Sequence, residues 1–308
     1  MRHYGGTFKM IRENKCLTQK YVAGDELSRS LYVKVERGEV MPSFIKFQSI
    51  LQRLNLGYDE FFFLHDSYSL KDRELIIKDF KKVSYNTSLF VIRGIERRCT
   101  KYLMTENDVL IRDIHTICEG LVFLKNQQVQ KAKQHVKQIW ERLSKQDHLY
   151  YLEIILLKNI LFLFDLDITE EMVKRSIKEL EMYEALYETA ELQVSVLVNY
   201  SYLLIRNEDI EKAMKVLQFG KELCASKKRP DLVCDIYFYK AICCYISRKK
   251  YLYNYYLKEV LQIICLVSNP EKVEEVMAEL AIFVSSEEIS KVKGKYEKLK
   301  KIQMKFEL

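Results

Sequence analysis

The sequence predicts an all-α protein built of a small N-terminal helical domain and a longer solenoid of helical repeats. Only 3 prolines and 9 glycines interrupt its 308 residues, and Leu, Lys and Glu, which favour helices, are among its commonest residues. Helix starts also recur about every 40 residues in the second half of the chain, which is the period of tetratricopeptide-like two-helix repeats. A chain of this length and composition is therefore expected to fold as two helical domains.

The first domain should contain five helices, and its helix ends carry clear signals. Thr18 and Ser28 are good N-cap residues, a turn follows at Gly24-Asp25, and Gly38 is a natural helix stop. The predicted helices cover residues 4–15, 18–23, 28–36, 43–54 and 58–65. We expect the core to come from Phe8, Ile11, Leu17, Phe44, Phe47, Ile50, Leu51 and Leu54.

The segment from Leu17 to Gly38 has the spacing of a helix-turn-helix, so the first domain is predicted to be lambda-repressor-like. Leu27, Tyr32 and Val35 fall on one face of the second helix and should pack inward, which leaves the other face for DNA. The N-terminal part of such a helix enters the major groove, so we expect Arg29 and Ser30 to meet base edges. Lys34 should contact a base or a phosphate, and Gln19 a backbone phosphate. The predicted DNA-contacting set is Gln19, Ser28, Arg29, Ser30, Lys34, Arg37 and Lys46.

Charge supports this interpretation. Residues 1–57 contain ten Lys and Arg against five Asp and Glu, although the whole chain carries only +7. Such an excess favours phosphate contacts and salt-sensitive binding, but a mixed solvated surface would look similar.

The apolar run from Tyr58 to Leu64 should dock the first domain onto the second, and the polar segment 66–70 marks the boundary. We therefore predict a DNA-binding domain at 1–66 and a regulatory, peptide-binding and dimerisation domain at 70–308. The helices expected in the second domain cover residues 70–84, 88–104, 109–124, 128–143, 148–164, 169–186, 188–206, 210–225, 231–247, 251–267, 270–284 and 287–306.

Stacked helix pairs form a curved solenoid whose inner wall is usually lined by the first helix of each pair. Asn159 and Asn199 are polar amides in apolar helices one repeat apart. An amide both donates to and accepts from a peptide backbone, so the two together favour a ligand groove. The alternative is that each satisfies a neighbouring helix end or loop. The predicted peptide-contacting set is Asn159, Asn199, Tyr202 and Tyr237.

The sequence carries no motif of an enzyme, such as a phosphate-binding P-loop or a metalloprotease helix. The eight cysteines include no C-x-x-C pair, and most should be buried free thiols in a reducing compartment. The five histidines are scattered without evident carboxylate or cysteine partners, so neither a catalytic residue, a bound metal nor a cofactor is expected. There is no signal peptide and no apolar run long enough to span a membrane, which predicts a cytoplasmic protein without membrane partners.

The helix-turn-helix sequence LTQKYVAGDELSRSLYVKVERGE, followed by a long helical-repeat domain, resembles the Rgg/GadR/MutR regulators of Gram-positive bacteria, part of the RRNPP group of peptide receptors. The specific motifs lie in residues 6–66, and the YDEFFFLHDSY run looks like the domain junction of that family. A departure at Leu31-Tyr32-Val33, where the family more often has smaller or polar residues, affects the expected operator sequence.

The resemblance implies a cytoplasmic homodimeric transcription regulator that binds a pseudo-palindromic double-stranded operator and responds to a short hydrophobic pheromone peptide, as in quorum sensing. Two other functions stay open. The chain could be a protein-interaction receptor, which would keep its function after deletion of residues 1–66. It could also be a regulator without a peptide ligand, which short hydrophobic peptides would not stabilise against heat.

Overall fold

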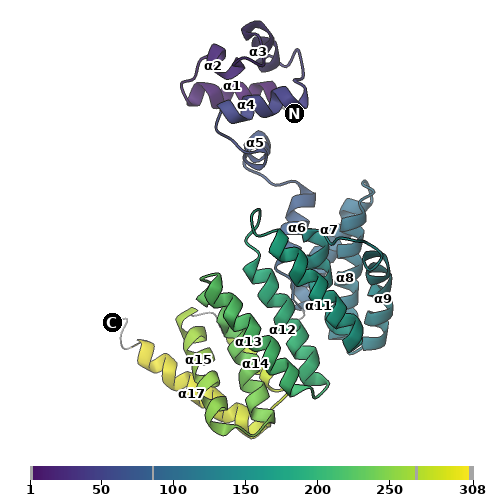
Figure 1. The fold of residues 1–308 in the computed structure, drawn as a ribbon, viewed down its shortest axis with the longest axis vertical. Helices are drawn as coiled ribbons and strands as arrows, with labels where there is room; N and C mark the ends of the chain where they lie inside the picture. Colours follow the sequence, from purple (N-terminus) through teal and green to yellow (C-terminus); the bar gives the residue numbers. More distant parts are fainter. Residues whose placement is uncertain (1–2, 85–86, 268–269, 305–308) are drawn as a thin grey trace. The chain divides into compact units, whose positions relative to one another are not determined.

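The computed structural model describes residues 3–84, 87–267 and 270–304, and these fold as helices joined by short loops, with no strand among them (Figure 1). The chain divides into two compact units, Met1–Lys78 and Asp79–Leu308. The predicted all-α fold is confirmed. None of the helices in the described residues is long and apolar enough to cross a membrane.

Five helices and the start of a sixth make up unit 1. Their N-caps follow the predicted chemistry, since Thr18 Oγ1 accepts a hydrogen bond from the Tyr21 N–H and Ser28 Oγ accepts one from the Leu31 N–H. Gly24 and Gly38 have φ of 59° and 75°, where glycine is favoured because it has no Cβ. The helices are α1 (Tyr4–Asn14), α2 (Gln19–Ala23), α3 (Arg29–Glu36), α4 (Phe44–Arg53), α5 (Tyr58–His65) and α6 (Asp72–Lys81), the last of which spans the division.

An aromatic core holds unit 1 together. Phe8 packs on Phe61 and Phe47 with ring centroids 4.6 and 5.2 Å apart. Phe61 of the YDEFFFL run is thus a core residue of unit 1, whereas that run was expected to dock onto the next domain. The prediction that Phe44 lies in the core is wrong: it is 70% exposed, because it lies at the first turn of α4 and stacks only on Tyr58.

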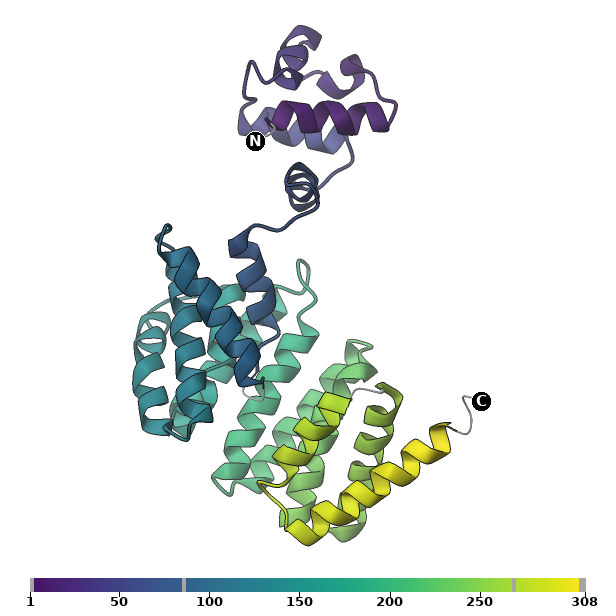
Figure 2. The same ribbon diagram turned by 180° about the vertical axis from the view of Figure 1, so that it is seen from behind.

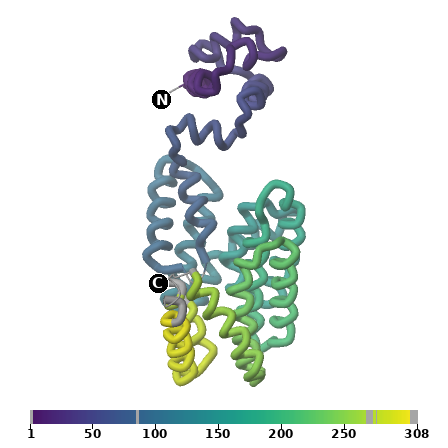
Figure 3. Tube along the Cα trace, turned by 90° about the vertical axis from the view of Figure 1, so that its left-hand side faces the viewer, coloured from purple at the N-terminus to yellow at the C-terminus, as the bar shows by residue number. Residues whose placement is uncertain are grey.

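Unit 2 consists of antiparallel helices that lie side by side, as Figures 1 and 3 show. Its first three complete helices are α7 (Leu89–Leu103), α8 (Val109–Lys125) and α9 (Val129–Leu143). The repeat pairs are α10 (Tyr151–Lys158) with α11 (Leu166–Met182), α12 (Ala190–Arg206) with α13 (Ile210–Ser226), and α14 (Val233–Ile246) with α15 (Lys250–Val267). The helices α16 (Pro270–Leu280) and α17 (Ser286–Met304) follow. The last two residues of the helix predicted at 287–306 lie outside the described part.

The predicted helix 148–164 is interrupted. It ends as α10 at Lys158, and a short 3-10 turn, η1 (Leu161–Leu163), follows. The buried hydroxyl of Thr169 on α11 donates to the Leu161 carbonyl over 2.8 Å. In a continuous helix this carbonyl would accept a hydrogen bond from a backbone N–H instead. A second 3-10 turn, η2 (Pro230–Leu232), precedes α14.

In Figure 2 the helix α16 crosses in front of the repeat helices. The hydroxyl of Tyr239 on α14 donates to a carboxylate oxygen of Glu279 on α16. Just beyond α16, the ring of Phe283 packs edge-on to Tyr202 of α12 at 6.0 Å. The inner wall of the solenoid is therefore partly covered by a later segment of the same chain.

Candidate nucleic-acid interface and ligand groove

The second helix of the helix-turn-helix, α3, presents its N-terminal end to solvent. Ser28, Arg29, Ser30 and Lys34 are exposed, and the Ser28 hydroxyl lies 3.0 Å from that of Ser30. Four amides at a helix start have no partner within the helix, and the dipole of the helix favours negative charge there. An exposed arginine beside this end is well placed for an anionic, hydrogen-bonding surface such as a DNA groove.

The opposite face of α3 is buried. Tyr32 and Val35 of α3 are 0% and 1% exposed, and Leu27, just before the N-cap, is 4% exposed, as the spacing predicted. The crossing of α1 over α3 is close: a Cβ on Gly5 would lie 1.9 Å from the Val35 carbonyl oxygen. These contacts fix which face of α3 is free.

A buried ion pair joins α3 to α1, and no local signal in the sequence indicates it. Arg12 donates through Nε to Glu36 Oε1 over 2.6 Å and through Nη2 to Oε2 over 3.2 Å. Burial acts to raise the pKa of Glu36, but the hydrogen bonds from Arg12 and Gln19 outweigh it and lower that pKa. The hydrogen bond to Glu36 also raises the pKa of Arg12.

The remaining predicted DNA residues differ in exposure. Gln19 donates through Nε2 to Glu36 Oε2 over 2.9 Å, so one of its two amide hydrogens is engaged inside the domain and is not available to a phosphate. Arg37 is exposed and pairs weakly with Glu39 at 3.7 Å. Lys46 on α4 is half-buried.

Unit 2 contains a groove of about 1070 Å³ on the inner wall, and four separate stretches of chain build it. It runs between the end of α8, η1, the C-terminal half of α12, and α16. Its apolar lining includes Leu124, Phe162 and Leu203, and its charged lining includes Arg206 and Glu279. The other lining residues are Lys125, Gln127, Val129, Leu163, Tyr202, Asn207, Glu274, Ala278 and Ile282.

Neither of the two predicted amides lines this groove. Asn159 is fully buried at the end of α10, where its Nδ2 donates to the Ile155 carbonyl over 3.1 Å. Asn199 is 6% exposed and donates to the Lys158 carbonyl over 2.9 Å. Both amides therefore satisfy the C-terminal end of α10, and the expectation that Asn159 lies on the wall is corrected. Asn199 still borders a smaller adjoining hollow with Glu279.

The two predicted tyrosines also separate. Tyr202 lines the groove, and its hydroxyl has a pKa raised by burial. Tyr237 does not line it and packs instead on Tyr256 of α15, with ring centroids 5.5 Å apart. The face of α14 that carries Tyr237 is turned toward its own repeat partner.

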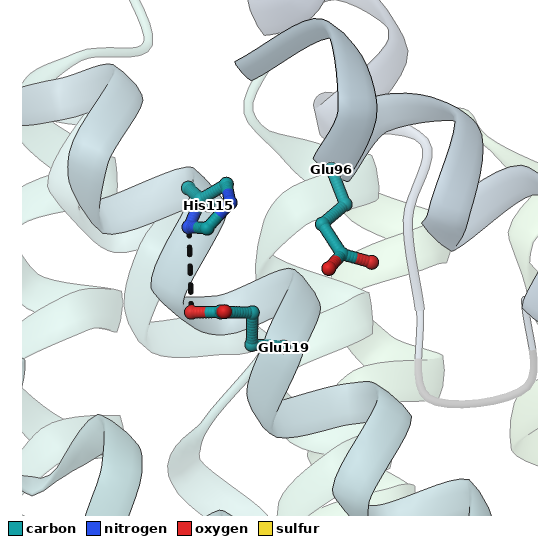
Figure 4. Close-up of side chains that lie close together, drawn as sticks. All are labelled: Glu96, His115 and Glu119. Atoms are coloured by element: carbon teal, nitrogen blue, oxygen red, sulfur yellow. Dashed lines mark ion pairs between the residues drawn. The ribbon is translucent and has the colours of Figure 1, made fainter. Parts of the chain in front are cut away.

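The histidines are not isolated, which corrects the sequence-based expectation. His115 and His135 both lie near the carboxylate of Glu119, at 3.3 and 2.9 Å, and His148 lies 3.1 Å from Glu179. Figure 4 shows His115 and Glu119 with Glu96 of the neighbouring helix. Only the i,i+4 spacing of His115 and Glu119 on α8 was visible in the sequence.

The fold matches those of several solved structures over nearly their whole length. A candidate transcriptional regulator from Listeria monocytogenes EGD-e is 20% identical, with a TM-score of 0.73 over 93% of this chain and 99% of that one. Bacillus thuringiensis PlcR, in complex with the peptide PapR7 and DNA, is 16% identical, with a TM-score of 0.63 over 93% of this chain and 100% of that one. The SHP pheromone receptor Rgg2 of Streptococcus dysgalactiae is 16% identical, with a TM-score of 0.63 over 96% of this chain and 99% of that one.

The chain has the fold of these regulators. A helix-turn-helix domain followed by a tetratricopeptide-like helical unit is common to it and to them, which confirms the predicted architecture. No family model matches the sequence. The likeness is thus carried by the arrangement of helices, at identities of 20% and below.

Proposed function

We propose that this chain is a homodimeric, sequence-specific DNA-binding transcriptional regulator, and that a short hydrophobic peptide held in the groove of unit 2 controls it. The exposed N-terminal end of α3, held in place by the buried Arg12–Glu36 pair, is the observation that carries the DNA-binding half. The shared fold supports it, because PlcR was solved with both a peptide and DNA.

Arg29 and Ser30 are the proposed base readers. An arginine that donates two hydrogen bonds to the O6 and N7 of guanine is the commonest specific contact in the major groove. Lys34, one turn further along α3, and Arg37 would contact phosphates. A symmetric dimer would place two copies of α3 about one DNA turn apart, roughly 34–36 Å, on a pseudo-palindromic operator.

Selection of bound duplexes from a random pool tests this half. The wild-type chain should enrich a two-fold symmetric site, and Arg29→Ala should weaken binding to that site by about 1–3 kcal/mol, or roughly 5- to 150-fold. Lys215→Ala, which removes an exposed lysine of α13 in unit 2, is the matched control and should leave binding unchanged. Without enrichment of any sequence, the protein-interaction function becomes the better proposal.

The chemistry of the groove supports a peptide. Its lining combines apolar side chains with two cations, Lys125 on α8 and Arg206 on α12, and with two carboxylates of α16, Glu274 and Glu279. A short peptide has an amino group at one end and a carboxylate at the other, so its carboxylate would pair with Arg206 and its amino end with the carboxylates of α16. Another hollow, of about 750 Å³, carries Arg248, Lys250, Lys291 and Lys295 against a single carboxylate, which suits an anion better than an apolar peptide.

A thermal-shift screen with short hydrophobic peptides tests the second half. A peptide at about a hundred times its dissociation constant adds roughly 2.7 kcal/mol to the stability of the folded state. Arg206→Ala should abolish the thermal shift caused by a peptide with a free C-terminal carboxylate. It should not change the shift caused by the same peptide when its C-terminus is an amide. If no peptide stabilises the wild-type chain while operator binding persists, the protein is a regulator without a peptide ligand.

We assign no enzymatic reaction to this chain. The solved proteins that share its fold are described as transcriptional regulators and pheromone receptors. Because the proposed ligand is DNA, which in a bacterium lies in the cytoplasm, we propose that this chain acts in that compartment.

A further inference from the structure

Two neighbouring helices of unit 2 bring metal-ligating side chains together away from the groove. Glu96 lies on α7, and His115 and Glu119 lie one turn apart on α8 (Figure 4). One ligand atom from each residue lies within 4.8 Å of the others. The side chains are 17%, 22% and 34% exposed, so the cluster is half-buried and open to solutes.

We propose that Glu96, His115 and Glu119 form a binding site for a divalent transition-metal ion such as Zn²⁺. Around one Zn²⁺, with bonds of about 2.0–2.2 Å, ligand atoms lie roughly 3 to 3.5 Å apart. His115 Nδ1 and Glu119 Oε2 already lie 3.3 Å apart. Three protein ligands with one position left for water is a common zinc arrangement.

The hydrogen bonds around His115 leave its Nδ1 lone pair for the metal. Thr100 donates its hydroxyl hydrogen to the Glu96 carbonyl over 3.1 Å, and its oxygen lies 3.0 Å from His115 Nε2. When the Thr100 hydrogen points to that carbonyl, its oxygen accepts from the Nε2–H of His115, and this tautomer leaves the Nδ1 lone pair for a metal. A ligating histidine held through its second nitrogen in this way is typical of metal sites.

Glu119 is oriented in the same manner. His135 on α9 lies 2.9 Å away through Nε2 and holds the carboxylate oxygen that faces His115. The ring of His135 is itself fixed against Phe123, at a centroid distance of 5.5 Å. Thr100 and His135 are thus positioning residues for the two ligands on α8.

Glu96 has a partner that a metal can displace. Arg93, one turn earlier on α7, pairs with it at 3.1 Å and is 52% exposed. Such surface pairs contribute little to stability, so the free-energy cost of releasing Glu96 is small. A bound cation would offset the repulsion between two carboxylates and join α7 to α8.

Titration calorimetry of the full reduced chain with Zn²⁺, compared with Mg²⁺, tests the proposal. Zn²⁺ should bind at one site and Mg²⁺ should not compete, because Mg²⁺ prefers six oxygen ligands and an imidazole does not suit it. His115→Gln should abolish this binding, and Thr100→Val should weaken it by roughly 10- to 100-fold through loss of orientation. His148→Gln is the matched control: it removes another histidine paired with a glutamate in unit 2, at 3.1 Å, and should leave Zn²⁺ affinity unchanged.

Two further readouts make the outcome decisive. Co²⁺ bound at this site should show visible d–d absorption without a thiolate charge-transfer band, which separates it from binding to cysteine. Zn²⁺ should also protect His115 of the wild-type chain from diethyl pyrocarbonate, a measurement that requires no variant to fold. Absence of Zn²⁺ binding, equal affinity of His115→Gln, or a thiolate band would each overturn the proposal.

Discussion

The buried pair of Arg12 and Glu36 offers a sharp test of how α3 is held. Glu36 is 3% exposed and Arg12 is 10% exposed at the side chain, and two hydrogen bonds of 2.6 and 3.2 Å join them. Arg12→Met keeps the aliphatic part of the side chain and removes the charge. Glu36 would then be a buried carboxylate without its cationic partner, and we expect unit 1 to lose about 3–5 kcal/mol.

The stability lost in Arg12→Met should depend on pH. In the wild-type chain the Glu36 pKa is lowered, so the pair contributes stability above the unfolded value of 4.5, and this is lost as the pH falls through the folded pKa. In Arg12→Met the effect of burial dominates and raises the Glu36 pKa. Protonation of Glu36 then removes the buried charge from the variant. Its loss of unfolding free energy relative to the wild-type chain should therefore be larger at pH 7 than near pH 4.5.

Hydrogen–deuterium exchange of α1 and α3, read by mass spectrometry and corrected for intrinsic rates, measures the opening free energy of unit 1. Fluorescence cannot do so, because the single tryptophan, Trp140, lies in α9 of unit 2. The double variant Arg12→Met/Glu36→Gln should recover most of the loss, since no buried charge remains. Arg37→Met, which removes an exposed pair at 3.7 Å, should change stability by less than about 1 kcal/mol. A pH-independent deficit, or no recovery in the double variant, would refute the reasoning.

Two further predictions concern packing and a buried lysine. Gly5→Ala should destabilise unit 1 by about 1–3 kcal/mol, because its Cβ would overlap the Val35 carbonyl oxygen, whereas Gly6→Ala, whose Cβ would meet nothing closer than 3.7 Å, should be neutral or stabilising in the same exchange measurement. Burial lowers the pKa of Lys158 from 10.5 to about 8. Between these pH values the unfolded chain binds more protons than the folded chain, so the free energy of unfolding of unit 2 should rise by roughly 3 kcal/mol as the pH increases from the lower value to the higher. Denaturant melts followed by tryptophan fluorescence should show this gain in the wild-type chain and not in Lys158→Met, and a gain that persists in the variant would rule out Lys158 as its source.

Features set by a few consecutive residues were predictable from the sequence. The caps at Thr18 and Ser28, the stop at Gly38 and the inward face of α3 depend on local hydrogen bonds and helical spacing, and all are present. The all-α class follows from composition in the same way.

Features that depend on distant contacts were not predictable. Arg12 and Glu36 meet because α1 crosses α3, and nothing in either helix marks them as partners. The break after Lys158 relies on the hydroxyl of Thr169, which the fold returns to that point. Asn159 and Asn199 were predicted to share a ligand groove, but both donate to carbonyls at the end of α10, so periodicity alone could not distinguish a ligand site from a helix end.

The groove residues were mostly missed for the same reason. Phe162, Arg206 and Glu279 come from η1, α12 and α16, and only the folded chain brings them to one wall. Tyr202 was the one predicted peptide residue that lines this groove.

The central claim is that a ligand in the groove of unit 2 controls how α3 reads DNA. Fluorescence anisotropy of the selected operator, measured at several salt concentrations with and without a stabilising peptide, tests it most directly. We predict that the peptide shifts operator affinity by about 5- to 150-fold, that the operator shifts peptide affinity by the same factor, and that Arg206→Ala removes the coupling while Arg29→Ala removes operator binding itself. Tight peptide binding that leaves both operator affinity and dimerisation unchanged would contradict the account.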